Sequence, residues 1–127
     1  MKTTKINIYS LNRKIKIKKE VVKKIVGLVF RGEKYHFKEV NIIIADDSLL
    51  KTLNRKFFKK NRPTNVISFN LEDVAEVYLS SDRAENREQL LFFLVHGLLH
   101  ICGYDHKNRS EEKFMEKKCL KYLTELC

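Results

Sequence analysis

The sequence predicts an α+β domain in which a single mixed four-stranded sheet packs against about four helices. Short β-branched stretches alternate with longer stretches that carry apolar residues at helical spacing, and two strand-like stretches adjoin without a helix between them. The chain has 127 residues, of which 43% are hydrophobic, with one proline and four glycines. This length and the absence of a linker-like segment predict one domain over residues 1–127.

The first half of the chain is expected to hold two strands and two helices. Residues 5–9 alternate polar and apolar side chains, which is typical of a strand. Residues 20–30 place valine, isoleucine and leucine at helical spacing, and residues 40–44 form a short β-branched strand that should be buried on both faces. Three N-cap candidates at residues 46–48 begin a helix that should run to about residue 57.

The second half is expected to hold a hairpin followed by two helices. Residues 65–69 and 76–79 are strand-like and close in sequence, which favours an antiparallel pair. A long helix over about 85–102 has a leucine-rich core face and should end at Gly103. A last helix covers about 110–126, with its apolar stripe facing the core.

The net charge of +10 arises from 26 Lys and Arg against 16 Asp and Glu. Such a charge favours polyanions such as RNA, although lysine-rich surfaces are common and charge alone leaves nucleic-acid binding open. The chain has no membrane-length apolar run, and its first residues lack the pattern of a signal peptide. We therefore expect a soluble cytoplasmic protein with no membrane partner.

Three of the four histidines fall within eleven residues, at His96, His100 and His106. The first two are four apart on the predicted helix, so both rings should project from one face. Gly103 can adopt a left-handed conformation and fold the chain back, which would bring the third histidine to the same ion. Three neutral histidines with an open position are typical of a catalytic zinc site. The prediction is one zinc ion per chain.

The remaining histidine, two cysteines and one aspartate are further candidates for ligands or catalytic groups. Cys102 should point away from the histidines and, like Cys119, is interpreted as a small buried hydrophobe. His36 has no partner nearby in sequence and is interpreted as a surface residue. Asp105, beside the third histidine, is a candidate to orient a ligand or carry a proton, but it could equally cap a turn.

The histidine spacing is shared with metzincin peptidases, which carry a general-base glutamate directly after the first histidine. Gly97 occupies that position here and has no side chain. The chemistry of that peptidase class therefore disfavours a zinc metallopeptidase, which stays the less favoured alternative.

The segment HGLLHICGYDH at residues 96–106 resembles the H-G-x-L-H-L-x-G-Y-D-H signature of the YbeY family and differs from it only at Ile101. The dipeptide LN at 53–54 and the stretch PTNVISF at 63–69 are also similar to that family, so the resemblance covers nearly the whole chain. It implies a zincin-like, zinc-dependent endoribonuclease specific for single-stranded RNA. It also implies a role in rRNA maturation at the 3′ end of small-subunit rRNA, a role in ribosome quality control, and possible contact with the small ribosomal subunit. The oligomeric state stays open.

Two departures from the family pattern matter. The family usually has arginine where this chain has Phe58, and that arginine is thought to help hold the phosphate; Lys59 and Lys60 are adjacent. Ala75 replaces a glycine, which is a minor change. The missing arginine keeps a second hypothesis open, in which the chain is a non-catalytic ribosome- or rRNA-binding maturation factor.

RNA contacts are expected from residues 51–62, which hold six basic residues and no acidic one. Basic side chains follow phosphates, and aromatic rings stack on unpaired bases. Phe57 and Phe58 could serve such stacking, or at least one of them could belong to the inner face of the helix. The candidate RNA-binding residues are Arg55, Lys59, Lys60 and Arg62.

Overall fold

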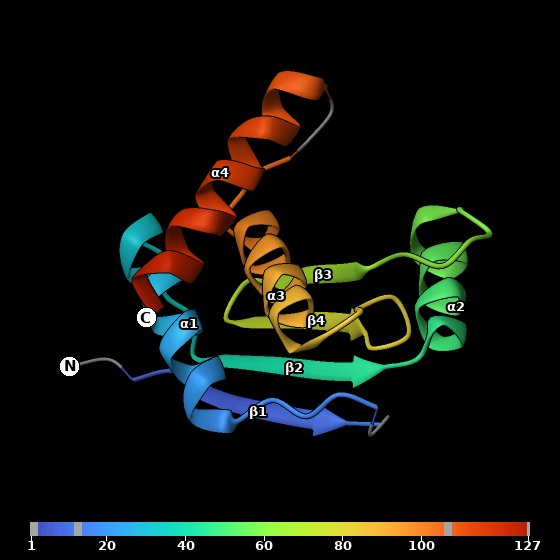
Figure 1. The fold of residues 1–127 in the computed structure, drawn as a ribbon, viewed down its shortest axis with the longest axis horizontal. Helices are drawn as coiled ribbons and strands as arrows, with labels where there is room; N and C mark the ends of the chain where they lie inside the picture. Colours follow the sequence, from blue (N-terminus) through green and yellow to red (C-terminus); the bar gives the residue numbers. More distant parts are fainter. Residues whose placement is uncertain (1–2, 12–13, 106–107, 127) are drawn as a thin grey trace.

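The computed structural model describes residues 3–11, 14–105 and 108–126, and its elements follow the predicted order (Figure 1). The strands are β1 (Lys5–Ser10), β2 (Glu39–Ala45), β3 (Val66–Leu71) and β4 (Val74–Ser80). The helices are α1 (Lys19–Glu33), α2 (Asp47–Phe58), α3 (Arg87–Ile101) and α4 (Arg109–Leu126). The expected α+β class with one mixed four-stranded sheet is confirmed. No helix of the described residues is long and apolar enough to cross a membrane.

The sheet has the order β1-β2-β4-β3. β1 and β4 each pair with β2 in parallel, whereas β3 pairs with β4 antiparallel, so the predicted hairpin is confirmed. Its turn is local: Glu72 adopts a left-handed φ of 71°, and its amide donates to the Asn70 side chain at 3.0 Å. The Asn70 amide group also donates to the carbonyl of Ile101 at 3.2 Å, which ties the hairpin to the end of α3.

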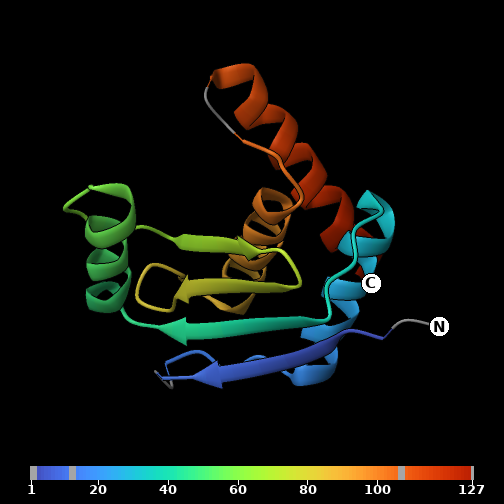
Figure 2. The same ribbon diagram turned by 180° about the vertical axis from the view of Figure 1, so that it is seen from behind.

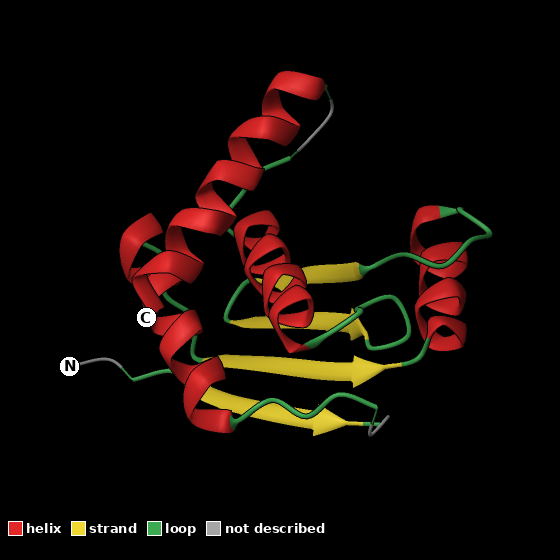
Figure 3. Cartoon of the chain, in the orientation of Figure 1, coloured by secondary structure: helices red, strands yellow, loops and turns green. Residues whose placement is uncertain are grey.

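Helices α1, α3 and α4 cover one face of the sheet, whereas α2 packs only at one end of the other face (Figures 1 and 2); β2 is apolar on both sides, as its sequence predicts. Ile42 and Ile44 point into the larger core, beneath α1, α3 and α4, whereas Ile43 and Ala45 point into a smaller cluster with Leu50 of α2. Figures 2 and 3 show α2 standing at the end of the sheet remote from the two chain termini. The carboxyl ends of the parallel strands β1, β2 and β4 therefore lie at the same end of the molecule as α2 (Figure 1).

Helix α3 is buried on almost every side, since it lies between the sheet on one side and α1 and α4 on the other. Leu90, Leu94 and Leu98 are completely shielded from solvent. His96 and His100 are only partly buried, on the one strip of the helix that the core does not cover. A polar pair in so apolar a helix marks the position of the candidate site.

Candidate metal centre and its basic groove

His96 and His100 lie one helical turn apart, with their ring centroids separated by 4.7 Å. Both line a hollow of about 280 Å³ between α3, α4 and the start of β3. Thr64 and Asn65 line it on one side, and Glu112 and Glu116 of α4 line it on the other. The two rings thus project from the same face of α3, as their spacing predicts.

The turn after α3 sets the orientation of His100. Gly103 takes a left-handed φ of 98°, and its amide donates to the carbonyl of His100 at 3.0 Å. The chain then folds back so that the Tyr104 carbonyl lies 2.8 Å from His100 Nδ1. A carbonyl only accepts, so Nδ1 is the protonated nitrogen, and the lone pair of the neutral ring is on Nε2. This tautomer is the one that ligates a metal through Nε2.

A buried polar cluster holds that turn against the helices. Tyr104 donates its hydroxyl to Glu33 at 2.7 Å, Lys118 donates to the same carboxylate at 2.8 Å, and the Tyr122 hydroxyl also bonds it. Burial opposes ionisation of Glu33, but the hydrogen bonds from Lys118, Tyr122 and Tyr104 outweigh it and lower the pKa of the carboxyl. The charged carboxylate therefore links the end of α1 to α4 and to the turn beside His100.

Gly97 faces the sheet rather than the hollow. A Cβ at this position would lie 2.8 Å from Val66 Cγ2 and 2.8 Å from Val77 Cγ1. The Ser68 hydroxyl also donates to the Gly97 carbonyl at 2.9 Å, so helix and sheet are in close contact here. A peptidase-type glutamate at this position could not enter the site, because its side chain would meet the two β-strands.

The complete set of predicted ligands cannot be assembled from the described residues, because His106 lies outside them. Within residues 3–11, 14–105 and 108–126, no three His, Cys, Asp or Glu side chains form a group able to hold a metal ion. The chemistry of the described pair nevertheless fits a metal, since two imidazole side chains share one hollow and Nδ1 of one of them is held by a backbone carbonyl. The three-histidine zinc site remains a prediction.

Cys102 does not join the pair. Its side chain is buried in the core, and burial raises the pKa of its thiol to about 12. Cys119 is likewise buried and free, with its pKa raised to about 12 by burial. The interpretation of both as small core residues is confirmed, and the exposed His36 is a surface residue as expected.

Similar proteins identify the family. The family model described as "Endoribonuclease YbeY" matches residues 5–127. The chain belongs to the YbeY family. A relative named "Endoribonuclease YbeY" from Neorickettsia sennetsu is 34% identical over 122 residues, spanning 84% of this chain and 83% of the relative. Another of the same name from Syntrophus aciditrophicus is 30% identical, with 89% and 84% covered.

A solved structure shares the fold as well. The solution structure of TM1509 from Thermotoga maritima matches with a TM-score of 0.61 and 32% sequence identity. The match covers 95% of this chain and 88% of that one. The YbeY assignment rests on the family model and the named relatives, and the match to TM1509 shows that the fold of this chain also occurs in a solved structure.

A second hollow of about 420 Å³ contains the position at which this chain departs from the YbeY pattern. His100 lines it together with Asp105, Phe58 and Lys60. Phe58 is 48% exposed and stacks on Phe69 with a centroid distance of 6.1 Å. The residue that replaces the family's arginine therefore faces the cleft beside His100, and a lysine lines the same hollow.

The alternative that at least one of the two phenylalanines belongs to the inner face of α2 is wrong. Phe57 is 54% exposed and meets Phe69 edge-on at 5.2 Å. The buried residues of α2 are Leu50 and Asn54. The Phe57 and Phe58 rings lie in the last turn of the helix and do not belong to the smaller core cluster. Both rings are exposed enough to meet a ligand.

The predicted basic residues divide into two groups. Lys60 and Arg62 line a third hollow of about 390 Å³, whereas Lys59 and Arg55 line none of these three hollows. Lys59 instead ends α2, with a left-handed φ of 57° and its amide donating to the carbonyl of Arg55. The third hollow also includes Arg83, which the sequence does not single out because this arginine lies outside the basic segment, between β4 and α3. Glu112 and Glu116, whose spacing of four residues on α4 is the available signal, were missed as well.

Proposed function

We propose that this chain is a zinc-dependent endoribonuclease that cleaves single-stranded RNA during rRNA maturation, as one domain over residues 1–127. His96, His100 and His106 would hold the metal. The observation that carries the proposal is the placement of His96 and His100 in one hollow, with the His100 ring fixed by the Tyr104 carbonyl. Membership of the YbeY family supports the RNA substrate, since the relatives are named as endoribonucleases.

Zinc in such a site supplies a water that ionises near neutral pH and a Lewis acid for a phosphoryl oxygen. The residues of the chain supply position and charge. Lys60 lines the hollow that contains His100, so its ammonium can neutralise charge on a phosphate at the place where Phe58 cannot. Asp105 lines the same hollow and is the proposed proton carrier or orienting group.

Single-stranded RNA fits the exposed rings beside the cleft. Phe57 and Phe58 are about half exposed, and unpaired bases stack on such rings, whereas a duplex hides its base faces. The family resemblance adds four further parts to this proposal: an rRNA substrate at the 3′ end of small-subunit rRNA, contact with the small ribosomal subunit, a part in ribosome quality control, and a cytoplasmic location.

The alternative of a non-catalytic rRNA-binding factor is favoured by one observation, the exposed Phe58 in place of a cationic side chain. A zinc peptidase of the metzincin type is disfavoured because Gly97, at the position of that class's general-base glutamate, has no side chain and packs against β3 and β4. The endoribonuclease and the non-catalytic factor would both bind RNA, but only the endoribonuclease would cleave it.

The test measures metal content by mass spectrometry and cleavage of a single-stranded RNA by the same preparations. Wild type should carry about one zinc per chain and cut the RNA, and His100→Ala should lose both, because two histidines make a weak site. His36→Ala is the matched control, since it removes an exposed histidine far from the hollow in sequence. Zinc-loaded wild type that binds RNA without cutting it would leave the binding-factor hypothesis; full zinc in His100→Ala would refute the ligand assignment.

A further inference from the structure

Three cationic side chains from separate parts of the chain line one hollow of about 390 Å³. Lys60 and Arg62 come from the segment between α2 and β3, and Arg83 comes from the connection between β4 and α3. The neutral side chains of Asn54, Thr64 and Asn65 also line it, and none of the described residues that line it is acidic. Arg83 also pairs with Asp47, which does not line the hollow, and the remaining excess of positive charge favours a bound anion.

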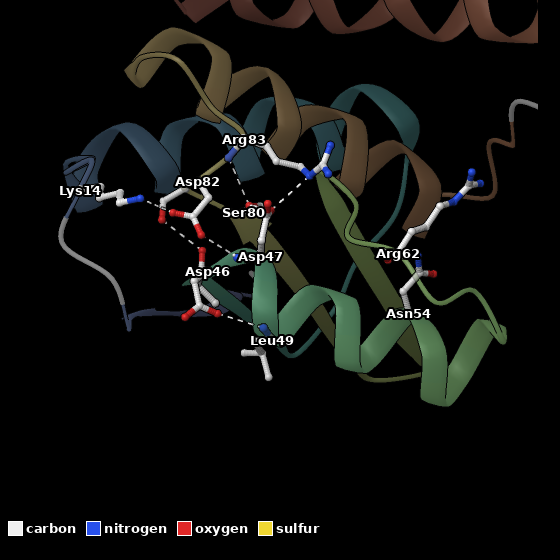
Figure 4. A network of polar contacts seen from close by, with 11 residues as sticks. Lys14, Asp46, Asp47, Leu49, Asn54, Arg62, Ser80, Asp82 and Arg83 are labelled. Atoms are coloured by element: carbon white, nitrogen blue, oxygen red, sulfur yellow. Dashed lines mark hydrogen bonds and ion pairs between the residues drawn. The ribbon is translucent and has the colours of Figure 1, made fainter.

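A carboxylate outside the hollow holds the Arg83 side chain in place. Its Nε donates to Asp47 Oδ1 at 3.2 Å, and the same oxygen accepts from the Ser80 hydroxyl at 2.8 Å (Figure 4). Asp82 in turn accepts from the amide of Asp47 at 2.9 Å and pairs with Lys14. A guanidinium anchored through Nε still has its terminal nitrogens, which are the donors that fork onto a phosphate.

The loop that carries Arg62 is also fixed. Asn54, which is 6% exposed, donates its side-chain amide to the Arg62 carbonyl at 2.9 Å. The backbone of the loop therefore cannot move freely relative to α2. In Figure 4 the side chain of Arg83 extends from Asp47 toward the side on which Arg62 and Asn54 lie. The Arg83 side chain and the backbone that carries Arg62 are thus held beside the hollow by contacts that do not depend on a ligand.

We propose that this hollow binds an internal phosphodiester of the RNA, next along the strand from the one at the histidines. This inference rests on the proposed function. The histidine hollow and the basic hollow share Thr64 and Asn65, so a continuous strand can pass from one to the other. On the opposite side of the histidines Glu112 and Glu116 repel phosphates, which directs the strand toward Arg83.

The test measures binding of a short single-stranded RNA by fluorescence anisotropy over a range of salt concentrations. Each phosphate contact on a single strand contributes about 0.7 to the slope of log K against log salt. Arg83→Gln should reduce the slope by about 0.7 and weaken binding. Arg62→Gln should do the same, because Arg62 lines this hollow and neither of the two hollows that His100 lines, so a folding defect in one variant leaves the other as a test.

Arg31→Gln is the matched control because it removes the same charge from an exposed position on α1. It should leave the slope almost unchanged. An equal loss from Arg31→Gln and Arg83→Gln would show a general field effect and overturn the proposal. RNA with and without a 5′-phosphate distinguishes the sources of the anion: a loss confined to the 5′-phosphorylated strand would assign the hollow to a terminal phosphate and overturn it. Wild type that binds RNA but does not cut it would refute the nuclease function while leaving this slope measurable.

Discussion

Replacing Gly97 by alanine tests the contact between α3 and the sheet that places the histidines. The added Cβ would lie 2.8, 2.8 and 2.9 Å from side-chain atoms of Val66, Val77 and Ser68. Nonbonded carbon atoms prefer about 3.5–4.0 Å, so the helix or the two strands must shift. Overpacking of this kind costs about 1–3 kcal/mol, against a gain of about 1 kcal/mol from the higher helix propensity of alanine.

Gly27→Ala provides the matched control within α1. A Cβ at Gly27 meets only Arg31 Nη2, at 3.6 Å, which is an ordinary contact. This variant should therefore gain about 1 kcal/mol from helix propensity alone. Both substitutions add the same methyl group to a helix, so the difference between their free energies of unfolding isolates the steric term. Gly97→Ala should be less stable than Gly27→Ala by about 1–3 kcal/mol.

Urea denaturation followed by circular dichroism gives both free energies of unfolding. A zinc titration on the same samples should show weaker binding for Gly97→Ala only, because a displaced α3 carries His96 with it. If Gly97→Ala is stabilised as much as Gly27→Ala, the close packing of α3 on β3 and β4 is wrong. The explanation for the absence of a peptidase base would then fail as well.

Three further outcomes are expected. Glu33→Gln should lower the free energy of unfolding by about 1–3 kcal/mol at neutral pH. Because the pKa of Glu33 is lowered in the folded protein, the carboxylate stabilises the fold above its unfolded pKa, and this stabilisation is lost as pH falls through the folded pKa. Thermal melts of wild type and variant should therefore converge in acid. Phe58→Arg should fold, since this side chain is 48% exposed, and should cleave RNA faster by up to about a hundredfold; an unfolded variant would contradict the exposure and an unchanged rate the account of the missing cation. In a Cys127→Ser background, Cys102 and Cys119 should resist a thiol reagent at pH 8 until urea unfolds the protein, because burial raises both pKa values to about 12. Rapid labelling of the native protein would contradict this expectation.

Features that depend on neighbours in the chain could be predicted from the sequence. The order of strands and helices follows from periods of two and 3.6 residues, and the pairing of His96 with His100 follows from their spacing on one helix. The turn at Gly103 follows from the freedom of glycine to adopt positive φ. Each of these is decided by sterics within a few residues, so one sequence suffices to predict it.

The sequence was less informative about which side chains face the cleft. Phe57 and Phe58 carry the apolar character of a core residue, yet both lie in the last turn of α2, beyond the cluster that Leu50 enters. Periodicity gives the faces of a helix and not the extent of the surface that each face meets. Lys59 and Lys60 are adjacent in sequence, but one ends the helix and the other lines two hollows.

By itself, the sequence determined the class of fold, the histidine pair and the resemblance to the YbeY family, because all three are written in local patterns. The tertiary structure decided that Arg83 joins Lys60 and Arg62 around one hollow, and that Gly97 faces the sheet. It also decided that Glu33 supports the turn beside His100 from 71 residues away in the chain. Such contacts depend on the order β1-β2-β4-β3 and on the close packing of α3, since the distance between remote residues is fixed only when the elements pack together.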